Sequence, residues 1–240
     1  MPPERPIPWP RLRRTRPGAL VALAGVGLVI AGGVILAVPP VLAAPPPLPA
    51  ILFLGTSLTA GYGLDPSQAY PALIQARIEA KGLRYRVVNA GVSGETSAGA
   101  RRRIDWLLRQ KIAVLVVETG ANDGLRAQDP AATRGNIQAI FDRARRQTPP
   151  PKIVLAGMQA LPNYGREYAT RFRALYPELA QANRAALIPF LLEGVAGVPR
   201  LNQDDGIHPT AEGHRIVAET VWKAIAPLLR EAEAPKKGPA

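Results

Sequence analysis

From residue 50 onward the sequence alternates between short apolar runs and longer amphipathic segments, and this alternation restricts the possible folds more than any other feature. Ile51 to Leu54 is a continuous apolar run that ends at Gly55, as expected for a parallel strand buried on both faces. Similar runs predict further strands at residues 85–90, 113–118 and 152–158. Strands that alternate with helices predict an α/β fold in which helices cover both faces of a sheet.

Five helices are expected between and after these strands, at residues 67–81, 97–110, 131–147, 171–186 and 210–230. The last of them carries an apolar stripe at helical spacing, formed by Val217, Val221, Ile225 and Leu228. No break in composition divides residues 51–230, so we expect a single domain there. Residues 231–240 are polar and contain prolines, which predicts a disordered tail.

An uncharged apolar stretch, residues 18–38, follows an Arg-rich segment near the N-terminus. Its 21 residues are enough to span a bilayer, and the preceding arginines favour translocation of the domain on its C-terminal side. Residues 1–44 are therefore expected to be a cleaved signal peptide, which the small residues at 41–44 favour, or an uncleaved signal anchor, which the length favours. Either alternative predicts an exported protein, periplasmic or extracellular, and the second adds a tether to the inner membrane. Residues 45–50 are rich in proline and predict a stiff linker.

The charge and the histidine and cysteine content argue against several functional classes. The formal net charge is +12, but residues 1–44 contribute +4 of it. The densest remaining cluster, residues 101–103, lacks interleaved aromatic side chains, so we expect a solvated helix face and no nucleic-acid partner. Attraction to an anionic membrane surface is the alternative. With no Cys and two His, the chain is not expected to hold a zinc–thiolate site, an iron–sulfur cluster or a histidine-rich metal site.

Polar segments follow the predicted strands at the points where the strands end. Ligands of open parallel sheets bind beside the carboxyl ends of the strands, so these segments are the candidates for a functional site. They are Gly55-Thr56-Ser57-Leu58, residues 89–94, residues 120–124 and the loop Asp204-Asp205-Gly206-Ile207-His208-Pro209.

Ser57 is a candidate nucleophile, because a Ser that follows a strand and a Gly can expose its hydroxyl at a turn into a helix. An N-cap is the alternative role for Ser at such a position. The base would have to be His208 or His214. His214 falls inside the last predicted helix, where a structural role is expected. Asp205 stands three residues before His208 and could orient its imidazole, or could instead cap the last helix.

Acyl transfer also needs hydrogen-bond donors for the oxygen that becomes negatively charged. The candidates are the backbone N–H groups of Ser57 and Gly94 and the side-chain amide of Asn122. Simple turn roles for Gly94 and Asn122 are the competing interpretations.

Taken together, these segments resemble the four ordered sequence blocks of the SGNH (GDSL) hydrolases over residues 51–229. Residues 60–62, 124–126, 161–165 and 204–209 are similar to the branch that contains bacterial thioesterase I, lysophospholipase and arylesterase. The resemblance implies a flavodoxin-like three-layer α/β/α sandwich with a five-stranded parallel sheet. It also implies a catalytic set of Ser57, Asp205 and His208, an oxyanion hole of Ser57, Gly94 and Asn122, and no cofactor.

The function implied by this resemblance is that of a serine esterase that hydrolyses small acyl esters, thioesters or lysophospholipids through an acyl-enzyme. An envelope carbohydrate O-acetyl esterase and a catalytically idle acyl-binding protein are the alternatives. Residues 157–171 follow the fourth predicted strand, so we expect them to form one wall of the acyl site, with Tyr164 contacting the substrate.

Thr56 departs from the family pattern, which has Asp before the nucleophile. Thr keeps a side-chain oxygen but carries no charge, so we expect weaker hydrogen bonding around the serine turn and an altered rate or selectivity. Asp123, next to Asn122, is expected to stabilise its loop.

Overall fold

The computed structural model describes residues 47–233. The expected signal peptide or anchor lies outside the described residues. So does most of the expected tail, of which residues 231–233 belong to the last helix. None of the helices in the described part of the chain is both long and apolar enough to cross a membrane.

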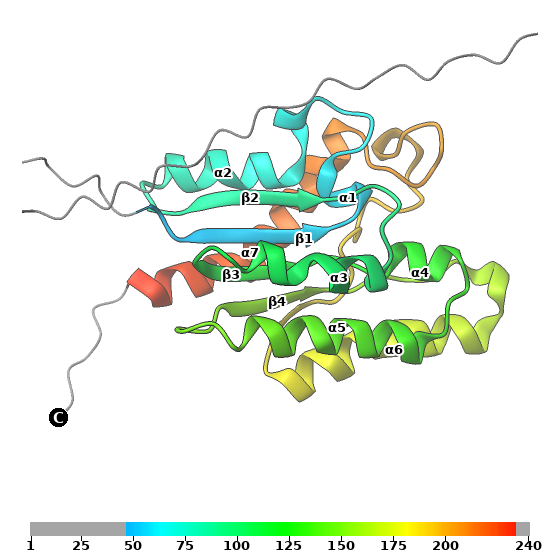
Figure 1. Cartoon of the computed structure of the whole chain (residues 1–240). Helices are drawn as coiled ribbons and strands as arrows, with labels where there is room; N and C mark the ends of the chain where they lie inside the picture. The colour runs from blue at the N-terminus through cyan, green and yellow to red at the C-terminus, as the bar shows by residue number, and fades with distance from the viewer. Residues whose placement is uncertain (1–46, 234–240) are drawn as a thin grey trace, which may run out of the picture. The chain divides into compact units, whose positions relative to one another are not determined.

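A five-stranded parallel sheet forms the centre of the fold (Figure 1). Its strands, in spatial order, are β2 (Arg86–Gly91), β1 (Ala50–Gly55), β3 (Ile112–Val117), β4 (Lys152–Ala156) and β5 (Ala186–Ile188). Every neighbouring pair is parallel. This order is that of a flavodoxin-like sheet, so the fold class expected from the sequence is confirmed.

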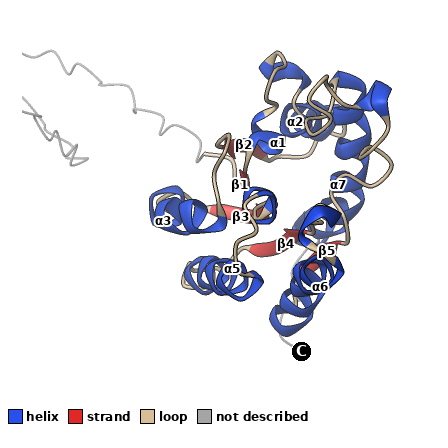
Figure 2. Cartoon of the chain, turned by 90° about the vertical axis from the view of Figure 1, so that its right-hand side faces the viewer, coloured by secondary structure: helices blue, strands red, loops and turns tan. Residues whose placement is uncertain are grey.

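Helices cover both faces of the sheet (Figure 2). Helices α2 (Tyr70–Ala80) and α7 (Ala211–Glu233) pack together on one face, and α3 (Ser97–Leu107), α5 (Pro130–Ala144) and α6 (Arg166–Asn183) pack side by side on the other. All five helices predicted from the sequence are present. The observed and predicted bounds differ most for α6, which begins one polar turn before the predicted start. This turn is held by the ring of Tyr168, whose centroid lies 5.9 Å from that of the stacked Phe172 ring.

Two kinds of element were not located by the sequence patterns. Strand β5 has three residues, too few to form a recognisable apolar run. The short helices α1 (Ser57–Ala60) and α4 (Ala121–Leu125) each cover about one turn, as do the 3-10 turns Pro66–Gln68, Pro162–Tyr164 and Pro199–Leu201. In addition, β2 is not buried on both faces as its pattern suggested. It is partly exposed because it is an edge strand that pairs with β1 alone.

Strand β1 is the most deeply buried strand and sets the position of the site. All of its residues are buried, since β1 lies between β2 and β3 under both helical layers. A fully buried aliphatic or aromatic side chain stabilises the fold by about 1.5–3 kcal/mol, so the burial of β1 stabilises the centre of the sheet. Helices α1 and α4 and the loop before α7 (orange) lie together at the carboxyl end of the sheet (Figure 1). The polar segments predicted to form a site therefore do meet.

Candidate active site

Ser57 is the first residue of α1, directly after β1. Thr56 is the N-cap of this helix, because its side chain accepts a hydrogen bond from the N–H of Leu58 at 3.4 Å. Ser57 is therefore not the cap, and its hydroxyl is available for other contacts. The turn packs closely on β2: a Cβ atom at Gly91 would lie 2.2 Å from the backbone nitrogen of Ala60, so a glycine is required there.

His208 connects Ser57 to Asp205. Its Nε2 lies 2.8 Å from the Ser57 hydroxyl oxygen, and its Nδ1 lies 2.6 Å from Oδ2 of Asp205. The other oxygen, Oδ1, accepts the N–H groups of His208 and Ile207 at 3.0 and 2.9 Å. The hydrogen bonds from His208, followed by that from Ile207, lower the pKa of Asp205 to about 2. Asp205 thus orients the imidazole and is not the cap of α7.

The ring of Tyr62 covers one side of this arrangement. Its centroid lies 4.6 Å from that of His208, and the side chain is 52% exposed. Tyr62 follows α1 in sequence, but nothing in its local pattern predicted a contact with a residue far along the chain.

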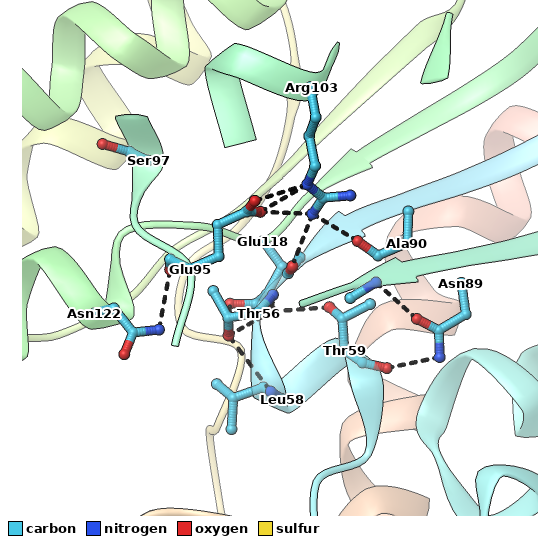
Figure 3. Close-up of polar contacts among 12 residues, drawn as sticks. Thr56, Leu58, Thr59, Asn89, Ala90, Glu95, Ser97, Arg103, Glu118 and Asn122 are labelled. Carbon is cyan, nitrogen blue, oxygen red and sulfur yellow. Dashed lines mark hydrogen bonds and ion pairs between the residues drawn. The ribbon is translucent and has the colours of Figure 1, made fainter. Parts of the chain in front are cut away.

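The three expected oxyanion donors lie around one cavity. Within residues 47–233 the backbone N–H groups of Ser57 and Gly94 have no acceptor. Gly94 has a φ of +76°, which favours glycine, and its carbonyl accepts both terminal N–H groups of Arg126 at 3.2 Å. The amide of Asn122 donates to the carbonyl of Glu95 at 3.0 Å, which leaves its second N–H available (Figure 3).

Arg103 ties the loop after β2 to the strand ends (Figure 3). Its guanidinium pairs with Glu95 at 2.6 Å and donates to the carbonyls of Ala90 and Gly55 at 2.7 and 3.2 Å. Arg101 and Arg102 are exposed, as expected of a solvated helix face, but the prediction was wrong for Arg103. Three consecutive arginines carry no sign of which one turns inward.

Glu118, which follows β3, is a buried acid that the sequence patterns did not single out. Its carboxylate accepts hydrogen bonds from the backbone N–H and the hydroxyl of Thr56 and from the hydroxyl of Thr59. Burial raises the pKa of Glu118 to about 7. A carboxylate directly after an apolar strand was the available signal. The serine turn thus keeps a network of hydrogen bonds although Thr56 carries no charge.

Two residues have the structural roles expected of them. Asp123 is fully buried and accepts the N–H and hydroxyl of Ser97 at 2.8 and 2.5 Å and the hydroxyl of Thr133 at 3.2 Å, so it stabilises its loop. Nδ1 of His214 accepts the backbone N–H of Tyr70 at 3.1 Å inside the core, where burial lowers the pKa of His214 to about 4.

A cavity of about 550 Å³ lies beside the Ser57 hydroxyl. Asn122 and His208 line it together with mainly apolar side chains, including Leu58, Leu125, Met158, Leu161, Phe190 and Leu192. Residues 158–161 belong to the segment expected to form a wall. Tyr164 is not among the lining residues; its hydroxyl donates to the carbonyl of Leu125 at 2.8 Å.

No cluster of three or more His, Asp or Glu side chains suited to a metal ion occurs within residues 47–233.

The fold and this arrangement of Ser, His and Asp define a class, the hydrolases built on a flavodoxin-like sheet. The chain belongs to the GDSL-like lipase/acylhydrolase family, whose sequence pattern matches residues 53–216. It is 43% identical to the esterase TesA of Pseudomonas aeruginosa over 180 residues, which are 75% of this chain and 89% of that protein. It is 37% identical to thioesterase 1/protease 1/lysophospholipase L1 of Escherichia coli, over 75% of this chain and 84% of the relative.

Solved structures agree with the sequence comparison. A crystal structure of TesA matches with a TM-score of 0.71 at 43% identity, covering 75% of this chain and 99% of that one. The SGNH-hydrolase family esterase AlinE4 matches with a TM-score of 0.63 at 38% identity, covering 80% and 100%. The protein is therefore an esterase, a hydrolase that acts on ester bonds.

Proposed function

We propose that Ser57 is the nucleophile, His208 the general base and Asp205 the acid that orients it. The observation that carries this assignment is the pair of short contacts on the two nitrogens of one imidazole, 2.8 Å to the Ser57 oxygen and 2.6 Å to Asp205. A base within hydrogen-bond reach of a hydroxyl, oriented by a third group, is the general arrangement for an activated serine.

The reaction would proceed in two halves. The Ser57 oxygen attacks the acyl carbon while Nε2 of His208 takes the hydroxyl proton, and the positive imidazolium is stabilised by Asp205. The negative oxygen of the tetrahedral intermediate is accommodated by N–H donors of Ser57, Gly94 and Asn122. His208 then gives the proton to the leaving group, and a water activated by the same base releases the acid from the acyl-enzyme.

We propose that the substrates are small acyl esters, including thioesters and lysophospholipids. The apolar lining of the cavity supports this proposal, because an acyl chain can be buried there beside the nucleophile. Relatives named as an esterase and as a thioesterase and lysophospholipase also support it. The same lining favours an acyl chain over the polar rings of an acetylated carbohydrate.

The first experiment tests the nucleophile. A fluorophosphonate probe should label the wild-type protein, and aryl esters of graded chain length should be hydrolysed. Ser57→Ala should lose both labelling and turnover, whereas Ser67→Ala, which changes an exposed Ser bonded to Asp65, should keep both. Turnover by the Ser57→Ala protein would refute the assignment. Acetate release from an acetylated glycan, with little action on longer acyl chains, would favour the carbohydrate esterase.

We propose that Tyr164 influences the choice of acyl chain through Leu125. Its hydroxyl holds the carbonyl of Leu125, and Leu125 lines the cavity. Tyr164→Ala should shift the chain-length profile of kcat/KM and leave the rate on an acetyl ester within about threefold, since the reacting groups are untouched. An unchanged profile over esters of graded length would rule this role out.

We further propose that the protein is exported, with residues 1–44 as the targeting segment. The Arg-rich flank and the apolar stretch at residues 18–38 support this. Fractionation of expressing cells, with the size of the mature chain measured by mass spectrometry, distinguishes a cleaved signal peptide from a membrane tether. Full-length protein in the cytosolic fraction would contradict both.

A further inference from the structure

A buried carboxylate that the proposed reaction does not use lies beside the turn that carries the nucleophile. Glu118 is 1% exposed. Its Oε2 accepts the backbone N–H of Thr56 at 2.7 Å and the hydroxyl of Thr59 at 2.8 Å. The Thr56 hydroxyl lies 3.0 and 3.1 Å from the two carboxylate oxygens (Figure 3). One side chain thus receives three donors from the turn.

These donors stand on both sides of Ser57 in the chain. Thr56 precedes Ser57 and caps α1 by accepting the N–H of Leu58, and Thr59 lies in the same short helix. Helix α1 has only four residues and therefore few internal hydrogen bonds of its own. Its orientation depends on contacts with the rest of the protein, and the residues that bond Glu118, Thr56 and Thr59, lie within two positions of Ser57 in the chain.

The chemistry at residue 56 suits this carboxylate. In the described part of the chain, the hydrogen-bond partners of Glu118 are neutral donors, and no Lys or Arg forms an ion pair with it. An Asp at residue 56, as in the family pattern, would bring a second carboxyl group against a buried carboxylate, which disfavours the charged forms. A Thr instead offers a hydroxyl that donates to it. Thr56 and Glu118 are therefore complementary.

We propose that Glu118 is the positioning residue for the nucleophile, and that Thr56 is the hydrogen-bond donor through which it acts. Glu118 holds the turn so that the Ser57 hydroxyl stays within reach of His208, and it does not contact the substrate. This inference rests on the assignment of Ser57 as nucleophile.

The test compares two variants at residue 56. Thr56→Val keeps the volume of the side chain but removes the hydroxyl, whereas Thr56→Ser keeps the hydroxyl. Thr56→Val should lower kcat by about 10- to 100-fold with KM within about twofold, because small misplacements of a reacting atom cost this much. The rate of fluorophosphonate labelling should fall by a similar factor. Thr56→Ser should stay within about threefold of the wild type in both measurements.

Glu118→Gln tests the carboxylate itself. The amide group keeps the size but replaces one acceptor oxygen by an NH₂ group and removes the charge, so a single neutral oxygen remains to accept the three donors. We expect kcat to fall by at least about tenfold, again without a matching change in KM.

Asn183→Ala serves as the control for a general loss of stability. Asn183 is a buried residue at the last turn of α6, where it is bonded to Gln138 and Arg145. This variant should lower the melting temperature and leave kcat unchanged. Wild-type kcat in Thr56→Val, an equal loss in Thr56→Ser, or an equal loss in Asn183→Ala would each overturn the proposal. Turnover by Ser57→Ala would instead overturn the assignment of the nucleophile, so the two failures are distinguishable.

Discussion

At the scale of single residues, His208 is the side chain on which the proposed catalytic site depends. Its two ring nitrogens contact two residues that are far apart in the sequence, Ser57 after the first strand and Asp205 before the last helix. An imidazole in this position can accept a proton on Nε2 only if Nδ1 carries the other one, and Asp205 favours that tautomer.

Asp205→Asn should therefore lower kcat by roughly 10²–10⁴-fold. We expect a value near the lower end of this range, because the Asp205 side chain is 40% exposed and water can replace part of its role. KM for a short aryl ester should change little. The neighbouring Asp204→Asn is the matched control, since Asp204 is exposed in the same loop. Steady-state kinetics on both variants checks this, and equal activities would count against the role of Asp205.

At the scale of elements, the site depends on how the strand ends are held together. Helix α3 contributes Arg103, which spans the ends of β1 and β2 and pairs with Glu95 beside Gly94. The side chains of Arg103 and Glu95 are 22% and 11% exposed, so the pair is screened less than a surface ion pair.

Arg103→Met should leave Glu95 largely buried without its partner and lower the free energy of unfolding by about 2–3 kcal/mol. It should also lower kcat, because Glu95 is adjacent to Gly94, one of the proposed oxyanion donors. Arg102→Met, on the exposed face of the same helix, should change neither quantity measurably. Urea denaturation and ester kinetics provide the test; equal stabilities of the two variants would show that the Arg103–Glu95 pair is energetically unimportant.

At the scale of the whole molecule, the free energy of unfolding depends on the protonation of two buried groups, Glu118 and His214, and their contributions change with pH in opposite directions. Burial raises the pKa of Glu118 from 4.5 to about 7, so the stability linked to this group is present at low pH and is lost as pH rises to 7. Burial lowers the pKa of His214 from 6.5 to about 4, so its contribution is present above pH 6.5 and is lost as pH falls to 4. Asp205, with a pKa of about 2, titrates below this window.

The wild-type protein should therefore show a nearly flat stability between pH 4.5 and 6.5, since the two slopes cancel. Glu118→Gln should become more stable as pH rises through this window, and His214→Gln should become less stable, each by up to about 3 kcal/mol. The buried tyrosines near Glu118, Tyr70 and Tyr176, stay neutral here because their pKa values lie well above the usual one. Thermal unfolding at several pH values measures this, and parallel curves for the two variants would contradict it.

Much of this architecture can be predicted from the amino-acid sequence. Continuous apolar runs predicted β1, β3 and β4 close to their observed bounds, because a strand buried on both faces must be apolar throughout. The resemblance of four short blocks pointed to Ser57, His208 and Asp205, which the structure brings together.

The remainder depended on tertiary contacts. Glu118 and Thr56 are 62 residues apart, and Ser57 and His208 are 151 residues apart, so their geometry follows from the packing of the sheet and not from local pattern. The sequence alone determined which segments become strands and helices and which polar residues end them, because burial and periodicity are local properties. Only the tertiary structure decided that Arg103 turns inward, that Tyr62 covers His208 and that Glu118 supports the serine turn, because each of these contacts exists only when distant segments are packed together.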